Sequence, residues 1–298
     1  MVVSVNHRIL LWPLLLLCAS AKAQVSLEST TVKQRQWLQA EYQLPAGPVL
    51  YREQASDTHS EGYYVETSVT AKGLHQRKVA DFGKTLTGEY LYNALVKRIE
   101  RYGFAVQYQC KALDCGELSG WQTLLEPLLD GETAKQYYLL AKAPTPLGGG
   151  YLSLHVADLD GQPRVVADII TADTSLRHLL DVVLFNDVFA FQPEQLIKSS
   201  EVYFALNSHT PLADSDSALK QMALKLAANN AGHFIVVGHA DNSGSALHNL
   251  LLSLARAQQV RQQLIAQYGI DASRLSVAGA GASGADASFR KTVLVSAD

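Results

Sequence analysis

Four polar residues in the last third of the chain have types and a spacing that suit a charged small ligand. Asp241 lies in a glycine-flanked turn, and the helical periodicity after the turn places Asn249, Ser253 and Arg256 on one face. A carboxylate pairs with an ammonium group, and a guanidinium can hold a carboxylate through two parallel hydrogen bonds. Asp241 and Arg256 could therefore hold a zwitterion. Asn249 and Ser253 could orient it through neutral hydrogen bonds.

The same residues also fit a structural role. An aspartate can cap a helix, and an aspartate with an arginine can form a surface salt bridge worth about 1 kcal/mol or less. If the residues form a ligand site, replacing Asp241 or Arg256 by alanine should abolish binding and leave the fold intact. His233 and His239 lack the converging carboxylates or cysteines of a metal site. Ser243 lacks the G-x-S-x-G setting of a hydrolase nucleophile.

The elements that must position these side chains alternate regularly. Apolar alternation predicts a strand through Val202, Phe204 and Leu206, and Pro211 with the polar residues after it indicates a helix. GHFIVVGH, RLSVAGAG and RKTVLVSA predict three more strands, and a second long helix follows the glycine-flanked turn. The order β-α-β-α-β-β predicts an α+β fold whose helices cover one face of a small mixed sheet. Because this pattern closes on itself, we expect residues 200–298 to fold alone.

Three stretches of this region, GHADNSG, NLLLSLARAQQV and YGIDASRL, together resemble the signature of the OmpA-like C-terminal domain. The family pattern reads G-H-T-D, then N-x-x-L-S-x-x-R-A-x-x-V, then G-I/V-x-x-x-R-L. The matching positions are Gly238, His239, Asp241, Gly244, Asn249, Leu252, Ser253, Arg256, Ala257, Val260, Gly269 and Arg274. The earlier stretch FALN is similar to the family's F-D-x-N and keeps Phe204 and Asn207.

Members of that family bind peptidoglycan without a covalent bond. The resemblance implies that the residues matching its aspartate and arginine hold the diaminopimelate side chain of the stem peptide, which is a zwitterion. The peptidoglycan-binding set implied in this way is Asp241, Arg256, Asn249, Ser253 and Asn207. The chain departs from the family at Ala205 and Ala240, where an acid and a threonine are usual. It also lacks the N-R-R stretch of the family, for which Arg290 and Lys291 are weak stand-ins.

The first 23 residues have the layout of a secretory signal peptide. A short polar start with Arg8 precedes the apolar run ILLWPLLLLCASA, and AKA before Gln24 is an A-x-A cleavage site. The run is short for a membrane span and contains Pro13. Lipidation at Cys18 and an uncleaved anchor are the alternatives, and Leu17 stands where a lipoprotein site needs a small residue.

Cleavage after Ala23 would leave Cys110 and Cys115 as the only cysteines. In an oxidising compartment such a close pair most often forms a local disulfide, whereas a zinc site would need further ligands at usable spacing. Around the pair, periodicity predicts a helix over residues 88–102, a strand at FAVQYQC and a hairpin over residues 151–171. Residues 175–198 read as a partly helical connector.

The length of 298 residues suits two domains, which we place at residues 24–195 and 196–298 after the signal peptide. The chain has 25 basic and 28 acidic residues, so its charge gives no reason to expect nucleic acid as a partner. No cofactor is expected. Trp37, Trp121 and the tyrosine pairs beginning at Tyr63 and Tyr137 are candidates for a sugar-stacking surface, although burial in a core is commoner.

The front region resembles an uncharacterised domain often found ahead of an OmpA-like domain in bacterial envelope proteins. That similarity rests on YGFAVQYQC, the C-x-x-x-x-C loop and Trp121, and it brings no activity with it. We expect a non-catalytic periplasmic protein of a Gram-negative bacterium that binds peptidoglycan and positions its N-terminal domain at the wall, with the outer membrane as a further candidate location. An outer-membrane or other envelope protein is a further candidate partner. The alternatives are a wall-targeted enzyme with its active site in the front domain, and a membrane-attached protein with a wall-binding tail.

Overall fold

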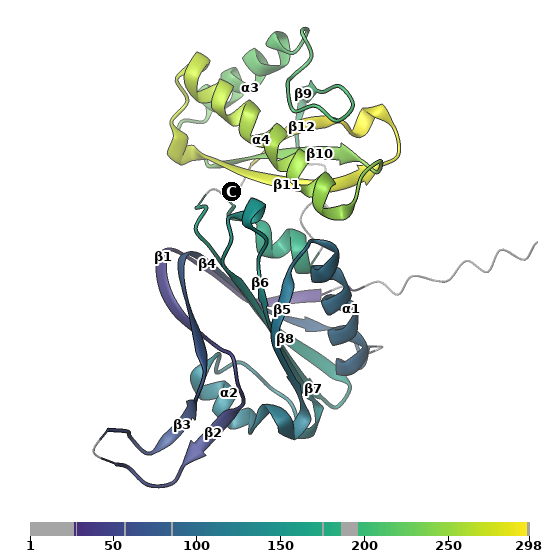
Figure 1. The fold of residues 1–298 in the computed structure, drawn as a ribbon. Coiled ribbons are helices and arrows are strands. Elements are labelled where there is room, and N and C mark those ends of the chain that lie inside the picture. Colours follow the sequence, from purple (N-terminus) through teal and green to yellow (C-terminus); the bar gives the residue numbers. More distant parts are fainter. Residues whose placement is uncertain are drawn as a thin grey trace, which may run out of the picture.

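The computed structural model describes residues 27–296 except positions 28, 57, 85 and 175 and the segment 186–195. The expected signal peptide therefore lies outside the described residues, as does part of the connector. Figure 1 shows two units, a front unit built on a large sheet and a smaller C-terminal unit. Among the helices of the described residues, none is both long and apolar enough to cross a membrane.

The front unit is mostly β-sheet. Its strands are β1 (Ser29–Pro45), β2 (Val49–Arg52), β3 (Gly62–Val65), β4 (Ser68–Phe82), β5 (Ala105–Lys111), β6 (Gln136–Lys142), β7 (Tyr151–Leu159) and β8 (Gln162–Thr171). Six of them form an antiparallel sheet in the order β1-β4-β8-β7-β6-β5, and β2 pairs with β3 in a separate ribbon. Its helices are α1 (Gly88–Arg101), α2 (Leu118–Leu124) and the short π-helix η4 (Asp181–Phe185), with the 3-10 turns η1 (Ala112–Cys115), η2 (Thr133–Lys135) and η3 (Thr145–Leu147).

Both faces of this sheet carry apolar side chains. Successive side chains of a strand point to opposite sides, and strands such as β6 and β8 contribute apolar residues to two separate clusters. On one face, Leu91 and Leu95 of α1 pack on Leu139 and Leu154. On the other face, Trp121 of α2 packs with neighbouring strand residues and is fully buried. The expected helix over residues 88–102 and the expected hairpin over residues 151–171 are both present. The strand within FAVQYQC is β5, at the edge of the sheet.

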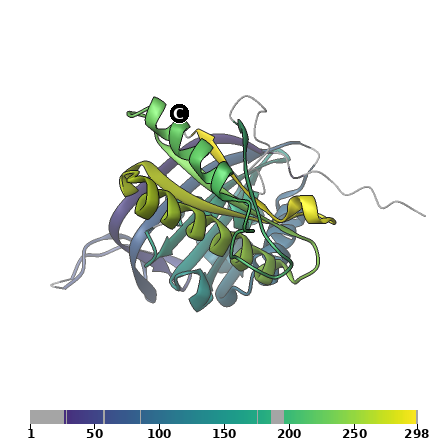
Figure 2. The same ribbon diagram turned by 90° about the horizontal axis from the view of Figure 1, so that it is seen from above.

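The C-terminal unit has the predicted order of elements. They are β9 (Leu196–Tyr203), α3 (Asp216–Ala228), β10 (Phe234–Asp241), α4 (Ala246–Tyr268), β11 (Leu275–Gly284) and β12 (Lys291–Ser296). The sheet order is β11-β10-β12-β9, in which β10 and β11 are parallel and the other neighbours antiparallel. Figure 2 shows α3 and α4 side by side over the sheet, and both pack on the face that carries Val236 and Leu294. The prediction of an α+β fold with helices on one face of a mixed sheet is confirmed.

One strand prediction was too long. β9 ends at Tyr203, although the Phe204 N–H still donates to the Arg290 carbonyl at 2.9 Å, and Leu206 is 60% exposed in a turn. Asn207 in the same turn has a φ of 52°, in the left-handed region, so the chain reverses here rather than extending. Val202 and Phe204 face the core as predicted, and the strand prediction fails at Leu206.

The two units touch through the first half of α4. Leu250 and Leu254 belong to the same apolar cluster as Leu176, Leu179 and Val182 of the front unit. The predicted domain boundary at residues 195 and 196 falls just before β9. β11 also meets the front unit, since Ser276 Oγ lies 3.5 Å from His178 Nε2. An apolar contact of this kind fixes the two units against each other more firmly than a polar one.

Candidate functional site

Asp241 is the last residue of β10 and begins the turn that leads into α4. Its Oδ1 accepts hydrogen bonds from the backbone N–H of Ser243, at 3.1 Å, and from the Ser243 hydroxyl. Four residues on, Ser245 caps α4 by accepting from the backbone N–H of His248 at 3.2 Å. The hydroxyl bond from Ser243 is the main cause that holds the pKa of Asp241 below its usual value. The carboxylate is therefore ionised at neutral pH.

Arg256 lies on α4 and is fully buried. Its guanidinium donates to three backbone carbonyls, from Nε to Ser208 at 2.8 Å, from Nη1 to His239 at 2.7 Å and from Nη2 to Ala205 at 3.1 Å. Burial lowers its pKa to about 10, so it stays charged at neutral pH. Asp241 and Arg256, which we call the candidate clamp, are thus both tied to the end of β10 and act on each other electrostatically.

Arg290, just before β12, completes a charged group with the candidate clamp. Its Nε lies 3.5 Å from Oδ2 of Asp241 and has no hydrogen-bond partner within the described part of the chain. Oδ1 of Asp241 is occupied by Ser243, whereas Oδ2 faces a cation at a distance longer than a good hydrogen bond. Of the two stand-ins considered from sequence, Arg290 contacts Asp241 and Lys291 instead pairs with Glu201.

Asn249 and Ser253 do lie on the face of α4 that carries Arg256, and this face is covered by the sheet. Asn249 is 2% exposed and donates from Nδ2 to the Gly244 carbonyl at 3.1 Å. Ser253 has no exposed surface, donates to the Leu250 carbonyl at 2.8 Å and accepts from the N–H of Gly281 at 3.0 Å. The described contacts of both side chains lie within the protein. They hold α4, its leading turn and β11 together.

The backbone of Asn207, and not its side chain, belongs to the surroundings of the clamp. Its side chain is exposed, and its left-handed φ shapes the turn whose Ala205 and Ser208 carbonyls accept from Arg256. The structure thus brings Asp241, Arg256 and this turn together and gives Asn249 and Ser253 internal partners.

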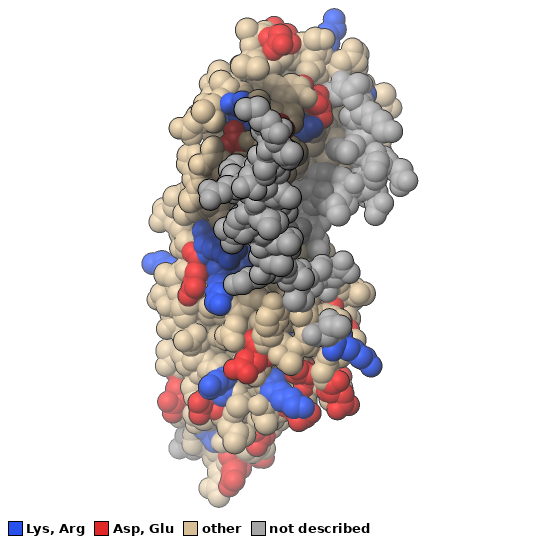
Figure 3. All heavy atoms as spheres, turned by 90° about the vertical axis from the view of Figure 1, so that its right-hand side faces the viewer, with Lys and Arg blue, Asp and Glu red and all other residues tan. Residues whose placement is uncertain are grey.

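The charges on the surface are mixed. Figure 3 shows acidic and basic side chains interspersed over the described atoms of one face, with most of them on the front unit. His239, beside the clamp on β10, is held neutral, because burial lowers its pKa to about 4. No group of three or more His, Cys, Asp or Glu side chains that could hold a metal ion occurs within the described ranges.

Sequence reasoning missed a buried ionic cluster in the front sheet. Asp168 accepts from Arg77 Nε at 2.6 Å and Nη2 at 3.0 Å, from His75 at 2.6 Å and from Ser153 at 3.3 Å. Its cross-strand partners are Arg77 on β4 and Ser153 on β7. Ser153 bonds the carboxylate rather than the imidazole, so the arrangement is not that of a Ser-His-Asp triad. The available signal was the charged residues within the apolar runs HQRKVADF and VVADII.

Cys110 and Cys115 are joined in a disulfide with Cα atoms 5.1 Å apart, as the sequence predicted. The bridge links the end of β5 to the short helical turn η1 (Ala112–Cys115), and the Cys115 carbonyl accepts from the Trp121 indole at 2.9 Å. The bridge therefore fixes the free end of an edge strand to the core.

Residues 203–292 match the family described as the OmpA family, so the C-terminal part of this chain is an OmpA-like domain. Outer membrane protein Omp38 of Acinetobacter baumannii is 34% identical over 92 residues, which are 30% of this chain and 26% of that protein. The chain thus spans about a quarter of the length of this curated relative. The peptidoglycan-associated lipoprotein from Burkholderia pseudomallei is 25% identical, with a TM-score of 0.31 over 36% of this chain and 97% of that one. The cell wall anchor of the T6SS from Pseudomonas aeruginosa is 29% identical, with a TM-score of 0.26 over 32% of this chain and 76% of that one.

Proposed function

We propose that this protein is a non-catalytic component of a Gram-negative cell envelope that binds peptidoglycan through residues 196–298. The observation that supports this most is the pairing of an OmpA-like domain with an aspartate and an arginine that meet at the end of β10. The ligand we propose is the diaminopimelate of the stem peptide. Its side chain carries an ammonium and a carboxylate, which match the two charges of the clamp.

The ammonium would bind Oδ2 of Asp241, because Oδ1 is already occupied by Ser243. There it would compete with Arg290, whose Nε sits 3.5 Å away. A compact ammonium with three donors can approach a carboxylate oxygen more closely than the Nε of an arginine held at that distance. Ligand binding would therefore move Arg290 aside.

The carboxylate would bind the hydrogens of the two Nη atoms of Arg256 that do not donate to His239 or Ala205. Arg256 has no exposed surface, so the ligand reaches it only after a neighbouring stretch of chain shifts. We propose that the binding-competent state has this guanidinium uncovered while its bonds to the backbone persist.

Sedimentation with purified sacculi tests the proposal, using the full chain and the substitution Asp241→Asn. Asparagine keeps the shape and the acceptor for Ser243 but removes the charge that the ammonium needs. Breaking a desolvated charge pair in this way costs on the order of 2 to 5 kcal/mol, so we expect the affinity for sacculi to fall at least about tenfold.

Asp271→Asn is the matched control. Asp271 forms the same kind of Asp-x-Ser turn, with its Oδ1 accepting from the N–H and the hydroxyl of Ser273 at 2.8 Å each, away from the clamp. It should sediment like the parent. Equal sedimentation of the Asp241→Asn protein would refute the clamp. Sacculi with lysine in place of diaminopimelate isolate the ligand, because equal binding to them would leave peptidoglycan binding standing and remove diaminopimelate as its basis.

The C-terminal domain would then hold the front unit at the wall, in the periplasm or at the outer membrane. A wall-targeted enzyme is the rival function. Its best candidate group, the cluster around Asp168, is at most 7% exposed at any of His75, Arg77, Ser153 and Asp168. In this cluster His75 and Ser153 each bond the Asp168 carboxylate, so no serine is paired with an imidazole base, and we favour the non-catalytic function.

A further inference from the structure

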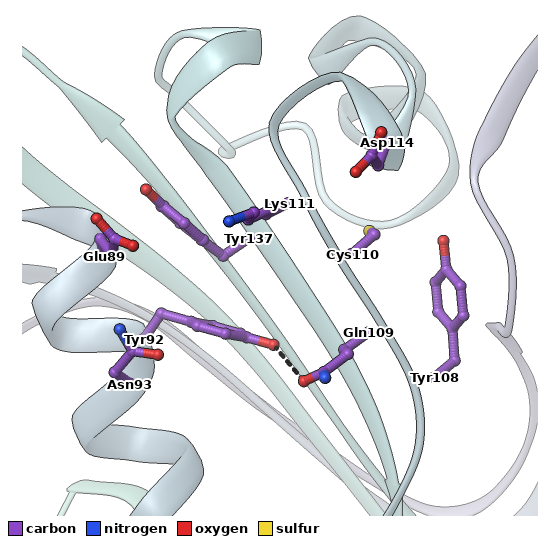
Figure 4. A pocket seen from close by; sticks show the side chains of 9 residues that line it. All are labelled: Glu89, Tyr92, Asn93, Tyr108, Gln109, Cys110, Lys111, Asp114 and Tyr137. Atoms are coloured by element: carbon purple, nitrogen blue, oxygen red, sulfur yellow. Dashed lines mark hydrogen bonds between the residues drawn. The ribbon is translucent and has the colours of Figure 1, made fainter.

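The front unit has a pocket of about 580 Å³ between α1 and the edge strand β5. Figure 4 shows the side chains of α1 on one side of it and those of β5 on the other, with Tyr137 of β6 between them. The pocket lies next to Cys110 and therefore next to the disulfide. Its volume is within the range of small-molecule sites, roughly 300 to 1,000 Å³.

We propose that this pocket binds a saccharide of pyranose rings. Resting on the proposed function, we further infer that the natural ligand is the glycan strand of peptidoglycan. The front unit would then contribute to wall binding through the sugar chain, while the C-terminal domain binds the stem peptide.

The aromatic lining supplies the surface on which a sugar ring packs. A pyranose presents a flat C–H face that is apolar and a rim of hydroxyl groups. Tyr92 and Tyr137 stack on each other with ring centroids 5.3 Å apart and planes 27° from parallel. Tyr92 is 8% exposed, and Tyr137 is half-buried, so part of the Tyr137 ring remains open to a ligand. Tyrosine combines an apolar face with a polar tip, which suits such a ring.

The polar lining supplies neutral donors and acceptors for the rim of the sugar. Asn93 on α1 and Gln109 on β5 are both exposed, and both line the pocket. The Tyr92 hydroxyl has a single hydrogen and two acceptors within reach, Gln109 Oε1 at 3.4 Å and the Tyr138 carbonyl at 3.3 Å. Both contacts are longer than a good hydrogen bond. The Gln109 amide is therefore weakly held and can be exchanged for a ligand hydroxyl.

The charges around the pocket fit a neutral polar ligand better than an ion. Glu89 and Asp114 contribute two carboxylates and Lys111 one ammonium, so both signs are present and the net charge is small. Carboxylates accept hydrogen bonds from sugar hydroxyls as readily as they pair with cations. The frame is also rigid, because α1 packs into the core and the disulfide fixes the end of β5. A preformed site of this kind binds without a large ordering cost.

Two sites on one chain for two parts of one polymer would raise the overall affinity. Once the stem peptide is bound, the glycan to which it is attached is present at a high effective concentration. Each site can then be weak alone and still hold the wall firmly together with the other.

The test uses the full chain and chitotetraose, a soluble N-acetylglucosamine oligomer without any peptide, in isothermal titration. We expect saturable binding. Tyr137→Leu removes the aromatic face while keeping an apolar side chain, and should weaken binding at least about tenfold. Gln109→Ala removes one hydrogen-bonding group on the surface and should weaken it about threefold to tenfold.

The chain offers two matched controls. Gln107 is the same residue type on the same strand, is exposed and, among the described residues, donates to the carbonyls of Ala105 and Val106. Tyr90 is a tyrosine on α1, 48% exposed and outside the pocket. Gln107→Ala and Tyr90→Ala should bind chitotetraose like the parent. Melting curves identify any variant that fails to fold, and Gln109→Ala then carries the test, because its side chain is exposed.

The outcomes separate this inference from the proposed function. Absence of chitotetraose binding, or binding unchanged in both Tyr137→Leu and Gln109→Ala, overturns the saccharide pocket even if sacculi still sediment in an Asp241-dependent way. Conversely, Asp241→Asn should leave chitotetraose binding intact. If sacculi fail to bind while chitotetraose binds in a Tyr137-dependent way, the saccharide pocket stands, and the peptidoglycan assignment of both units falls.

Discussion

Substituting Arg256 would not test ligand binding alone, because Arg256 also has a structural role. Its guanidinium serves the carbonyls of Ala205, Ser208 and His239, all of which would lose a partner in an alanine variant. Removing a fully buried side chain that makes three hydrogen bonds destabilises a fold. The expectation that Arg256→Ala leaves the fold intact is therefore revised, whereas Asp241→Asn removes the clamp at its more exposed end.

His155 on β7 gives a pH-dependent stability. It is fully buried, its Nδ1 has no hydrogen-bond partner within the described part of the chain, and burial lowers its pKa to about 3. The unfolded chain, with an ordinary imidazole pKa of about 6.5, binds a proton more readily than the folded protein. The stability that this contributes is complete above about pH 6.5. It is lost as the pH falls toward 3, at up to about 1.4 kcal/mol per pH unit.

Urea unfolding at several pH values checks this for the parent and for His155→Gln. The variant should have a shallower loss of unfolding free energy between about pH 6 and pH 4. Asp168 also has a lowered pKa, so its contribution to stability is likewise lost as the pH falls. Asp168 is present in both proteins, and its effect cancels in the comparison. The difference between the two curves therefore reports His155. Parallel curves would exclude it as the source.

Sequence spacing located the candidate clamp, but it did not show that the neighbouring polar residues on the same helix face are covered by the sheet. Helical periodicity fixes which side chains share a face, so Asn249, Ser253 and Arg256 were correctly placed together. Periodicity does not reveal what covers that face. Ser253 had the type expected at a ligand site, and only the packing of α4 on β11 shows that its hydroxyl is used by Gly281.

The helix α4 lies unusually close to the sheet, and small residues permit this. A Cβ on Gly238 of β10 would lie 1.9 Å from the Ser253 carbonyl oxygen. A Cβ on Gly279 of β11 would lie 2.6 Å from the Ser253 hydroxyl. The glycines that the sequence shows in the strands GHFIVVGH and RLSVAGAG thus have a packing reason. They allow Arg256 to reach the carbonyl of His239 on β10.

Gly238→Ala should therefore destabilise the C-terminal unit. The added methyl group meets backbone atoms that cannot rotate away, and overpacking of this kind costs about 1 to 3 kcal/mol or more. Chemical unfolding measures the change. Gly47→Ala is the matched control, because the atoms nearest to its Cβ are 3.9 Å away. A change in unfolding free energy no larger than that of the control would contradict the close approach.

The regular elements were predictable where their patterns were strong. β7 and β8 alternate clearly around a short turn, and α1 repeats leucines at helical spacing, so both were found from sequence. β1 was not assigned. It is a polar, largely exposed edge strand with two irregularities in its register against β4, so it lacks the alternation that marks a half-buried strand.

The contact between the two units was also beyond sequence reasoning. The sequence does not show which leucines of NLLLSLARAQQV would contact a surface outside their own domain. In the structure, Leu250 is fully buried and Leu254 is 7% exposed, in a cluster shared with Leu176 and Leu179 of the front unit. Leu247 and Leu251 pack at its edge. An apolar face can be recognised in one sequence, but the surface that meets it depends on the whole fold.

This contact sets an expectation for the isolated C-terminal unit. The core of residues 196–298 consists of their own side chains, so we expect this fragment to fold alone, expose the leucine face of α4 and self-associate. Replacing the two partly buried residues, as Leu247→Lys with Leu251→Lys, should restore a monomer, which sedimentation velocity measures. The same pair in the full chain should lower the melting temperature, because it places two ammonium groups at the contact between the units. A fragment that is monomeric without the substitutions, together with a full chain indifferent to them, would mean that α4 does not hold the two units together in solution.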